Sequence, residues 1–186
     1  MSVPRWALPE VPLLMAPTMS ELQAAMGAEL YSGDPELLGR EALSVMVGGM
    51  TAEHILERLT EGVAVIAPGD RSDVLLSLVN AHEAEGFPSL SGVILNGGLT
   101  LHPAIASLVG GLGQRLPILE TRFGTFETAR RVAGTRGRVT STSQRKIDTA
   151  LTLNARCFAQ AADSLPELVE TTSTGPARVF GLERKR

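Results

Sequence analysis

The sequence has little cysteine, few aromatic residues and no long apolar run. Its single cysteine, Cys157, excludes an internal disulfide and is typical of the reducing cytoplasm, where we expect this protein. One tryptophan and one tyrosine are too few for the aromatic platforms on which single-stranded nucleic acids stack. No apolar run approaches the ~20 residues that cross a bilayer, and prolines interrupt the N-terminal segment where a signal peptide needs an apolar core. We therefore expect neither nucleic-acid nor membrane partners.

The charge and the missing motifs exclude further classes of protein. A formal net charge of −3 gives no overall basic footprint for nucleic acid. The phosphate-binding patterns GxGxxG and GxxxxGK[ST] do not occur, and neither does the GxSxG pattern of a serine hydrolase. The three histidines stand singly, without HExxH or a Cys/His pair. The sequence therefore predicts no metal, no cofactor and no catalytic residue.

Short apolar runs do alternate with amphipathic segments along the chain. Strands are expected over 28–31, 43–47, 63–67, 91–95 and 116–119, and helices over 18–26, 51–59, 72–85, 102–112, 125–133 and 143–159. The strands do not alternate apolar and polar residues, which is typical of parallel strands buried on both faces. The pattern predicts an α/β fold, a three-layer α/β/α sandwich with a mostly parallel sheet.

The length of 186 residues is that of one domain with flanking segments. Residues 1–17 are interrupted by prolines and are expected to form an arm or linker. Residues 18–160 contain the strand and helix alternation and are expected to form the α/β domain. Residues 161–186 turn polar and end in a charged run, as expected of a C-terminal helix and a frayed tail.

Two loops that directly follow neighbouring strands carry the candidate ligand-binding residues, which are Asp70, Arg71, Asp73, Asn96, Gly97 and Gly98. The carboxyl ends of parallel strands share one edge of the sheet, where open α/β folds bind ligands. At a helix N-terminus, the arginine would hold an anion. In the alternative, the aspartates only cap the helix and pair with the arginine. The glycines either admit a ligand close to the backbone or simply form the turn.

A second candidate is a basic stretch in the C-terminal half. Between Glu127 and Asp148 no acidic residue occurs, whereas six basic residues do: Arg130, Arg131, Arg136, Arg138, Arg145 and Lys146. On an acidic protein this stretch predicts a local positive patch for an anionic ligand or an acidic partner. The alternative is a solvated helix face and loop. The loop after strand 116–119 is expected at the same sheet edge as Arg71.

These motifs resemble the DRTGG domain, whose name spells out its separated signature residues. Asp70-Arg71 and Gly97-Gly98 match the signature, while Asn96 takes the place of the threonine. The resemblance runs from about Thr18 to Phe158 and includes Gly48-Gly49-Met50, Leu59-Thr60-Glu61-Gly62, Phe87-Pro88-Ser89-Leu90, Leu116-Pro117-Ile118, Gly124-Thr125-Phe126-Glu127-Thr128 and Arg145-Lys146-Ile147. The combined set is similar to the middle portion of the long, actinobacterial-type form of bacterial phosphate acetyltransferase.

The resemblance implies a function without catalysis in this chain. The long form is similar to a P-loop-like domain, a DRTGG domain and a catalytic domain that transfers acetyl between coenzyme A and phosphate. This sequence matches the middle part, so the resemblance implies a regulatory and assembly domain that senses an anionic metabolite or nucleotide. It implies two partners, the catalytic domain of the parent enzyme and further copies of the chain, as in a dimer. The alternative is a stand-alone ligand-binding or adaptor protein. An enzyme in its own right is the least supported class.

Overall fold

The computed structural model describes residues 9–112, 115–141 and 143–170. Five strands form its sheet: β1 (Glu29–Ser32), β2 (Ser44–Val47), β3 (Val63–Pro68), β4 (Gly92–Asn96) and β5 (Ile118–Glu120). The helices are α1 (Pro12–Met15), α2 (Met19–Met26), the 3-10 helix η1 (Pro35–Gly39), α3 (Ala52–Leu56), α4 (Ser72–Glu83), α5 (Pro103–Leu112), α6 (Thr125–Gly134) and α7 (Gln144–Glu170). Each predicted strand is confirmed to within two residues at either end.

The sheet has the order β1-β5-β4-β3-β2. β2, β3, β4 and β5 run parallel to one another, and only β1 is antiparallel, with an irregular register between Leu30 and Ser32. The predicted mostly parallel sheet is therefore confirmed. The carboxyl ends of β3, β4 and β5 lie at one edge, because Pro68 pairs with Asn96 and Leu95 pairs with Glu120.

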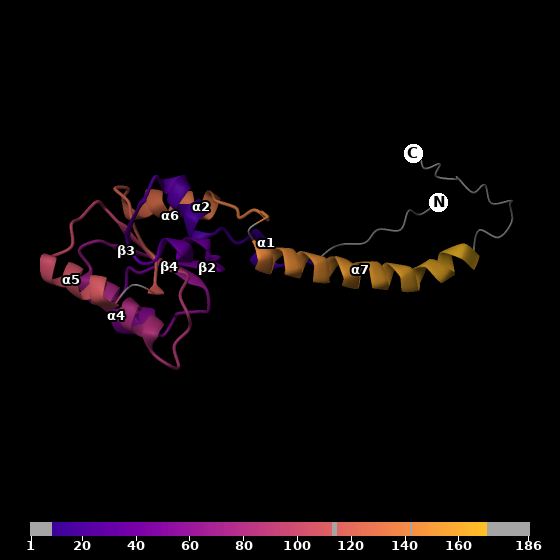
Figure 1. Cartoon of the computed structure of the whole chain (residues 1–186), viewed down its shortest axis with the longest axis horizontal. Coiled ribbons are helices and arrows are strands. Elements are labelled where there is room, and N and C mark those ends of the chain that lie inside the picture. Colours follow the sequence, from indigo (N-terminus) through magenta and orange to yellow (C-terminus); the bar gives the residue numbers. More distant parts are fainter. Residues whose placement is uncertain (1–8, 113–114, 142, 171–186) are drawn as a thin grey trace.

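Helices cover both faces of the sheet, as the three-layer prediction requires (Figure 1). The α3, α4 and α5 side shares one core with the sheet side chains Val65, Val93 and Ile118. The α2 and α6 side shares a second core with Ile66 and Leu119. Neighbouring residues of each central strand thus bury side chains on opposite faces, which explains why these strands read as continuous apolar runs.

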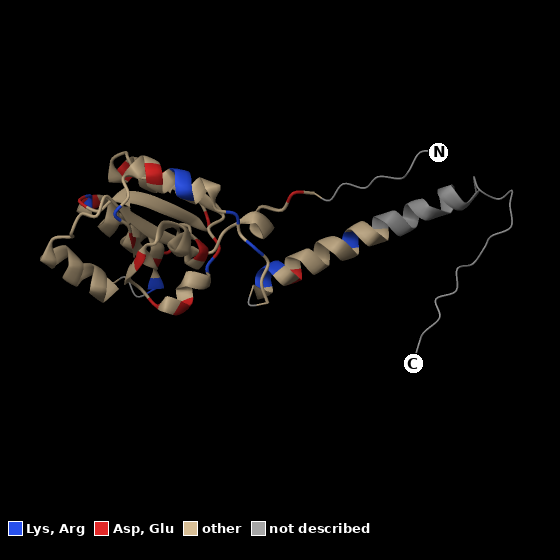
Figure 2. Cartoon of the chain, turned by 90° about the horizontal axis from the view of Figure 1, so that it is seen from above, with Lys and Arg blue, Asp and Glu red and all other residues tan. Residues whose placement is uncertain are grey.

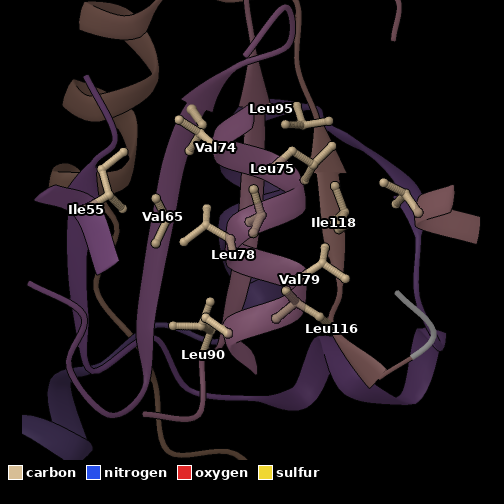
Figure 3. Packing of buried hydrophobic residues seen from close by; sticks show 14 of the residues in the cluster. Ile55, Val65, Val74, Leu75, Leu78, Val79, Leu90, Leu95, Leu116 and Ile118 are labelled. Atoms are coloured by element: carbon tan, nitrogen blue, oxygen red, sulfur yellow. The ribbon is translucent and has the colours of Figure 1, made fainter. Parts of the chain in front are cut away.

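The larger core is centred on α4. Leu75, Leu78 and Val79 of this helix point into the sheet and are fully or almost fully buried (Figure 3). They pack in one cluster with Val65 and Ile118. Burying one such aliphatic side chain contributes about 1.5–3 kcal/mol, so α4 is fixed firmly on β3 and β4. The loop that begins this helix is consequently held in place at the carboxyl edge.

The N-terminal end of the domain is fixed by a capping box. Thr18 Oγ1 accepts the backbone N–H of Glu21 at 3.2 Å, and Glu21 Oε2 accepts the N–H of Thr18 at 2.8 Å. Gly27 ends α2 in the left-handed conformation at φ 56°. Helix and cap agree with the sequence pattern.

Helix α7 leaves the body of the molecule from the side where α1 lies (Figure 1). Its base is anchored by Lys146, which is fully buried. Lys146 Nζ donates to the carbonyl oxygens of Ala16 at 2.6 Å and Arg138 at 3.2 Å. The helix was expected over 143–159 and extends in the structure to Glu170. Residues 9–17 of the expected arm contain α1 and the Ala16 carbonyl that Lys146 binds. Residues 1–8 and 171–186 lie outside the described residues.

Candidate functional site

The loops after β3 and β4 meet at the carboxyl edge, as the sequence predicts. The N–H of Gly69 donates to the carbonyl of Asn96 at 3.0 Å. A side chain at Gly69 would place its Cβ 2.7 Å from the carbonyl oxygen of Leu99, closer than any real contact allows. Glycine is therefore needed at position 69 because the backbone of the neighbouring loop fills the space.

Arg71 forms a bidentate ion pair with Asp73. Its Nε and Nη2 donate to the two carboxylate oxygens of Asp73 at 2.9 and 2.8 Å. Nη2 also donates to the carbonyl of Met50 at 3.1 Å, which ties the start of α4 to the loop between β2 and α3. The hydrogen bond from the guanidinium lowers the pKa of Asp73 to about 2 and raises that of Arg71. This is the local pairing that the sequence left open as an alternative.

Asp70 does not cap α4. The residue in the capping position is Arg71, without a side-chain cap hydrogen bond, and the helix begins at Ser72. Asp73 does occupy the first turn, where the helix dipole favours a negative charge. The exposed carboxylate of Asp70 thus lies one residue before the cap, beside the Arg71–Asp73 pair.

Asn96 is buried and holds three elements together. In the amide orientation that satisfies both ends, its oxygen accepts the N–H and the hydroxyl of Thr125, each at 2.7 Å. Its nitrogen then donates to the carbonyl of Ala67 at 2.9 Å. Asn96 therefore links the end of β4 to β3 and to the first residue of α6. Asn96 was predicted to contact a ligand, and in the structure its amide forms hydrogen bonds with other residues of the protein.

Gly97 and Gly98 form the turn that follows. Both have positive φ, 94° and 62°, a conformation that favours glycine. Their N–H groups donate to the carbonyls of Phe123 at 2.8 Å and Thr121 at 3.1 Å in the loop after β5. The glycines thus join the β4 loop to the β5 loop, and three loops interlock along the carboxyl edge.

Arg122 is a further cationic residue at this edge that the sequence reading missed. It lies two residues after β5, and a Cβ built on Gly98 would lie 3.4 Å from its Cα. Arg122 is exposed, and within the described part of the chain it forms no ion pair. It lines a hollow of about 430 Å³ whose wall also includes Thr121, Phe123 and the acidic residues Glu29 and Glu120. Its position three residues beyond the end of the predicted strand 116–119 was the available signal.

Helix α6 begins next to Arg122. Its cap is Gly124, which offers no side chain, so the first-turn amides carry the partial positive charge of the helix start. Phe126 in this turn is 83% exposed. The carboxyl edge therefore presents two arginines, a helix start and an exposed aromatic ring to solvent.

The basic stretch does not form one surface. On α6, Arg130 and Arg131 both pair with Glu127, at 2.8 and 2.7 Å, and hold the pKa of that carboxyl at about 2. Arg131 also donates to the carbonyl of Ala25 and lies over the ring of Phe123, 4.1 Å from its centroid. Figure 2 shows basic and acidic positions next to each other on α6, apart from the basic group at the base of α7.

The later basic residues lie at the opposite edge of the sheet from Arg71. Arg145 pairs with Glu41 at 3.5 Å and lines a small pocket with Gly62 and Ser91, which precede β3 and β4. Arg138 and Arg145 also line a groove of about 680 Å³ at the base of α7, whose wall includes the carboxylates of Glu21 and Glu41. Arg136 is exposed in the connection to α7, and Lys146 is buried. The groove is therefore of mixed charge.

The described residues contain no group of three or more histidine, cysteine, aspartate or glutamate side chains that could hold a metal ion. None of the helices in the described ranges is long and apolar enough to cross a membrane.

Comparison with known proteins places this geometry in a family. A model of the DRTGG domain matches residues 21–135, more than half of the chain. The chain is 32% identical over 154 residues to a phosphate acetyltransferase of Nitratidesulfovibrio vulgaris, covering 81% of this chain and 21% of that protein. It is 30% identical over 147 residues to a phosphate acetyltransferase of Synechocystis, covering 78% of this chain and 21% of that protein. The chain thus spans about a fifth of the length of these relatives.

A solved structure shares the fold. It is the CBS and DRTGG region of a Clostridium perfringens pyrophosphatase, complexed with its activator diadenosine tetraphosphate. The TM-score is 0.53 at 20% identity, over 72% of this chain and 56% of that one. The family match covers β1 to α6 and with them every loop of the carboxyl edge. The chain therefore belongs to the DRTGG domain family.

Proposed function

We propose that this chain is a regulatory domain of a phosphate acetyltransferase and is not catalytic by itself. The parent reaction converts acetyl-CoA and phosphate to acetyl phosphate and coenzyme A. The observation that carries the proposal is that most of this chain matches about a fifth of the length of such enzymes. The catalytic domain of the parent enzyme and further copies of this chain are the proposed partners, and the reducing cytoplasm suits the single thiol.

The ligand we propose is an anionic metabolite or nucleotide bound at the carboxyl edge. Arg122 offers a guanidinium without a carboxylate partner among the described residues. Arg71 offers a second one if an incoming anion replaces Asp73, and an exposed ion pair of this kind contributes only about 0–1 kcal/mol. A polyphosphate carries more charge than a carboxylate and accepts two arginines at once. The Clostridium perfringens relative was solved with a dinucleotide polyphosphate, which supports testing adenine nucleotides first.

The test is isothermal titration of the purified chain with adenine nucleotides, coenzyme A, acetyl phosphate and pyruvate. We expect saturable binding of at least one of these anions. Arg71→Ala and Arg122→Ala should each weaken it about tenfold, because each removes a charge-assisted contact of about 1.5 kcal/mol. Arg130→Ala is the matched control, since this exposed arginine lies along α6, outside the loops of the carboxyl edge and the hollow that Arg122 lines. No binding by a folded sample, or equal loss in the control, would contradict the sensing site.

A further inference from the structure

Two glutamates lie opposite each other at the carboxyl edge. Glu29 is the first residue of β1, Glu120 is the last residue of β5, and the two are direct partners in the antiparallel pair of these strands. Side chains in such a pair have Cβ atoms about 4.5–5.5 Å apart, and like charges there are destabilising. Within the described residues, neither carboxylate has an ion-pair or hydrogen-bond partner. Nothing in that part of the fold compensates these two charges.

Both glutamates line the same hollow as Arg122. Arg122 does not pair with Glu120, although the two are only two residues apart, and it has no other carboxylate partner in the described ranges. The volume of about 430 Å³ is within the range of small-molecule sites. One positive and two negative side chains, none of them paired within the described part of the chain, therefore line one ligand-sized hollow.

The charges of the hollow disfavour a small bare anion. Arg122 attracts an anion, but the two carboxylates on the same wall repel it and bring the sum of the three charges to −1. An ionised carboxylate only accepts hydrogen bonds, and acetyl phosphate and pyruvate have no hydroxyl that could donate one. A ligand that suits this hollow is anionic at the end that meets Arg122 and carries hydrogen-bond donors at the end that meets the glutamates.

A nucleoside polyphosphate has this distribution of groups. Its phosphates are anionic, and its ribose carries two neighbouring hydroxyls that donate hydrogen bonds. A glutamate or aspartate is the residue that holds a ribose hydroxyl in dinucleotide-binding folds, and hydrogen bonds to a carboxylate are among the stronger ones. An aromatic ring is also available to the base, because Phe126, four residues after Arg122, is 83% exposed.

We infer that the carboxyl edge selects nucleoside polyphosphates over bare anions, because Glu29 and Glu120 accept hydrogen bonds from the ribose while Arg122 binds the phosphates. This selectivity rests on the proposed function, whose ligand class it specifies. The glutamates act on the two kinds of ligand in opposite directions, since they bind the ribose hydroxyls and repel an anion that lacks them. Glutamates with only a structural role would change the affinity for both ligands in the same direction.

Calorimetric titration in metal-free buffer with ATP, 2′,3′-dideoxy-ATP and tripolyphosphate tests this selectivity. The wild-type chain should bind ATP about tenfold more tightly than either of the other two ligands, which lack the ribose hydroxyls. Glu120→Gln and Glu29→Gln should each weaken ATP binding and strengthen tripolyphosphate binding. Glu85→Gln is the matched control, since it removes the same charge from an exposed position in the connection that leads to the amino end of β4. It should keep the wild-type order of affinities.

The outcomes separate this selectivity from the anion site itself. Equal binding of ATP and dideoxy-ATP, with the same order of affinities in Glu120→Gln, would overturn the role of the glutamates and leave the anion site standing. Binding that requires Mg²⁺ and ignores the ribose hydroxyls would also overturn it, because the glutamates would then hold the metal ion. If a folded chain binds none of the three ligands, the proposed sensing site falls together with its selectivity. Urea unfolding of each glutamine variant establishes that the fold is retained.

Discussion

At the scale of single residues, the signature positions form hydrogen bonds that hold neighbouring loops of the protein together. Arg71 reaches from α4 to the carbonyl of Met50, and Asn96 reaches from β4 to Ala67 and Thr125. Gly97 and Gly98 supply the positive φ angles and the two amides that bind the β5 loop. Any ligand that binds at this edge therefore meets loops that are already held in place, which lowers the cost of ordering them on binding.

Substitution of Asn96 tests whether its hydrogen bonds hold the loops together. Asn96→Ala leaves the carbonyl of Ala67 and the N–H of Thr125 without their partner, and a buried polar group left unsatisfied costs about 1–3 kcal/mol. We expect the free energy of unfolding in urea to fall by this amount. Asn80→Ala serves as the control because Asn80 is exposed on α4 and bonds only within its own helix. An unchanged unfolding midpoint for Asn96→Ala would show that the hydrogen bonds of this amide do not stabilise the loops.

Substitution of Arg71 should change the pKa of Asp73 more than it changes the stability of the protein. The guanidinium holds the pKa of Asp73 at about 2, below its ordinary value of 3.8. In Arg71→Ala the pKa of Asp73 should return toward 3.8, as followed by NMR of the carboxylate. Because the pair is exposed and screened by water, we expect little change in the free energy of unfolding. A pKa of Asp73 that stays near 2 would mean that the helix start, and not Arg71, stabilises the charge.

His82 predicts a pH dependence. Its Nδ1 accepts the N–H of Leu90 at 3.0 Å, which requires an unprotonated nitrogen. Burial, with the charge of Arg40 nearby, lowers the pKa of His82 below its ordinary 6.5. Between these two values the unfolded chain binds more protons than the folded one, so stability is complete above pH 6.5 and falls as the pH drops through the folded pKa.

Urea unfolding at pH 7.5, 6.5 and 5.5 measures this effect. His82→Gln should flatten the loss of stability over that range, while His54→Gln, on an exposed part of α3, should keep the wild-type slope. If His82→Gln and the wild-type chain lose stability in parallel, another group is responsible.

At the scale of elements, the alternation of strands and helices could be predicted from the sequence because it depends on residues that are close together in the chain. The apolar runs of β3 and β4 and the capping box of α2 depend on residues next to one another in the chain. The contacts of Asn96 were not readable, since Thr125 lies 29 residues away. The basic residues of 130–146 are divided between two places because α6 and the connection after it carry the chain from the carboxyl edge, where β5 ends, to the amino edge, where Arg145 lies.

Lys146 is the clearest case of a residue whose place depends on tertiary structure. Lysine is rarely fully buried, and the sequence places it in a basic run that favours exposure. The structure buries it instead, with its ammonium group bonded to the carbonyls of Ala16 and Arg138. The lysine thereby joins the segment before α2 to the base of α7.

Substitution of Lys146 should loosen both of these elements together. Lys146→Met removes the two hydrogen bonds, keeps much of the apolar volume, and is expected to cost about 1–3 kcal/mol through the carbonyls left unpaired. Hydrogen exchange should rise in α1 and at the base of α7, and not in α4. Arg145→Ala, which removes only an exposed ion pair at 3.5 Å, is the control and should change little. Unaltered exchange in Lys146→Met would show that packing alone holds α1.

At the scale of the whole molecule, the two edges of the sheet have different roles. The carboxyl edge holds the signature loops, Arg122 and the start of α6. The amino edge holds the base of α7, which Lys146 and Arg145 join to the domain. Helix α6 runs from the carboxyl edge back toward the amino edge and contacts β2, β3 and α2, so it joins the two edges of the sheet mechanically.

An anion bound at the carboxyl edge should move the amide chemical shifts of the loops that form this edge, which a titration with adenine nucleotides followed by NMR measures. We predict that the shifts that move belong to residues 69–71, 97–99 and 121–126, and that those at the amino edge, such as Ser91 and Arg145, stay in place. Shifts confined to the groove at the base of α7, or no shifts at saturating nucleotide, would contradict the account.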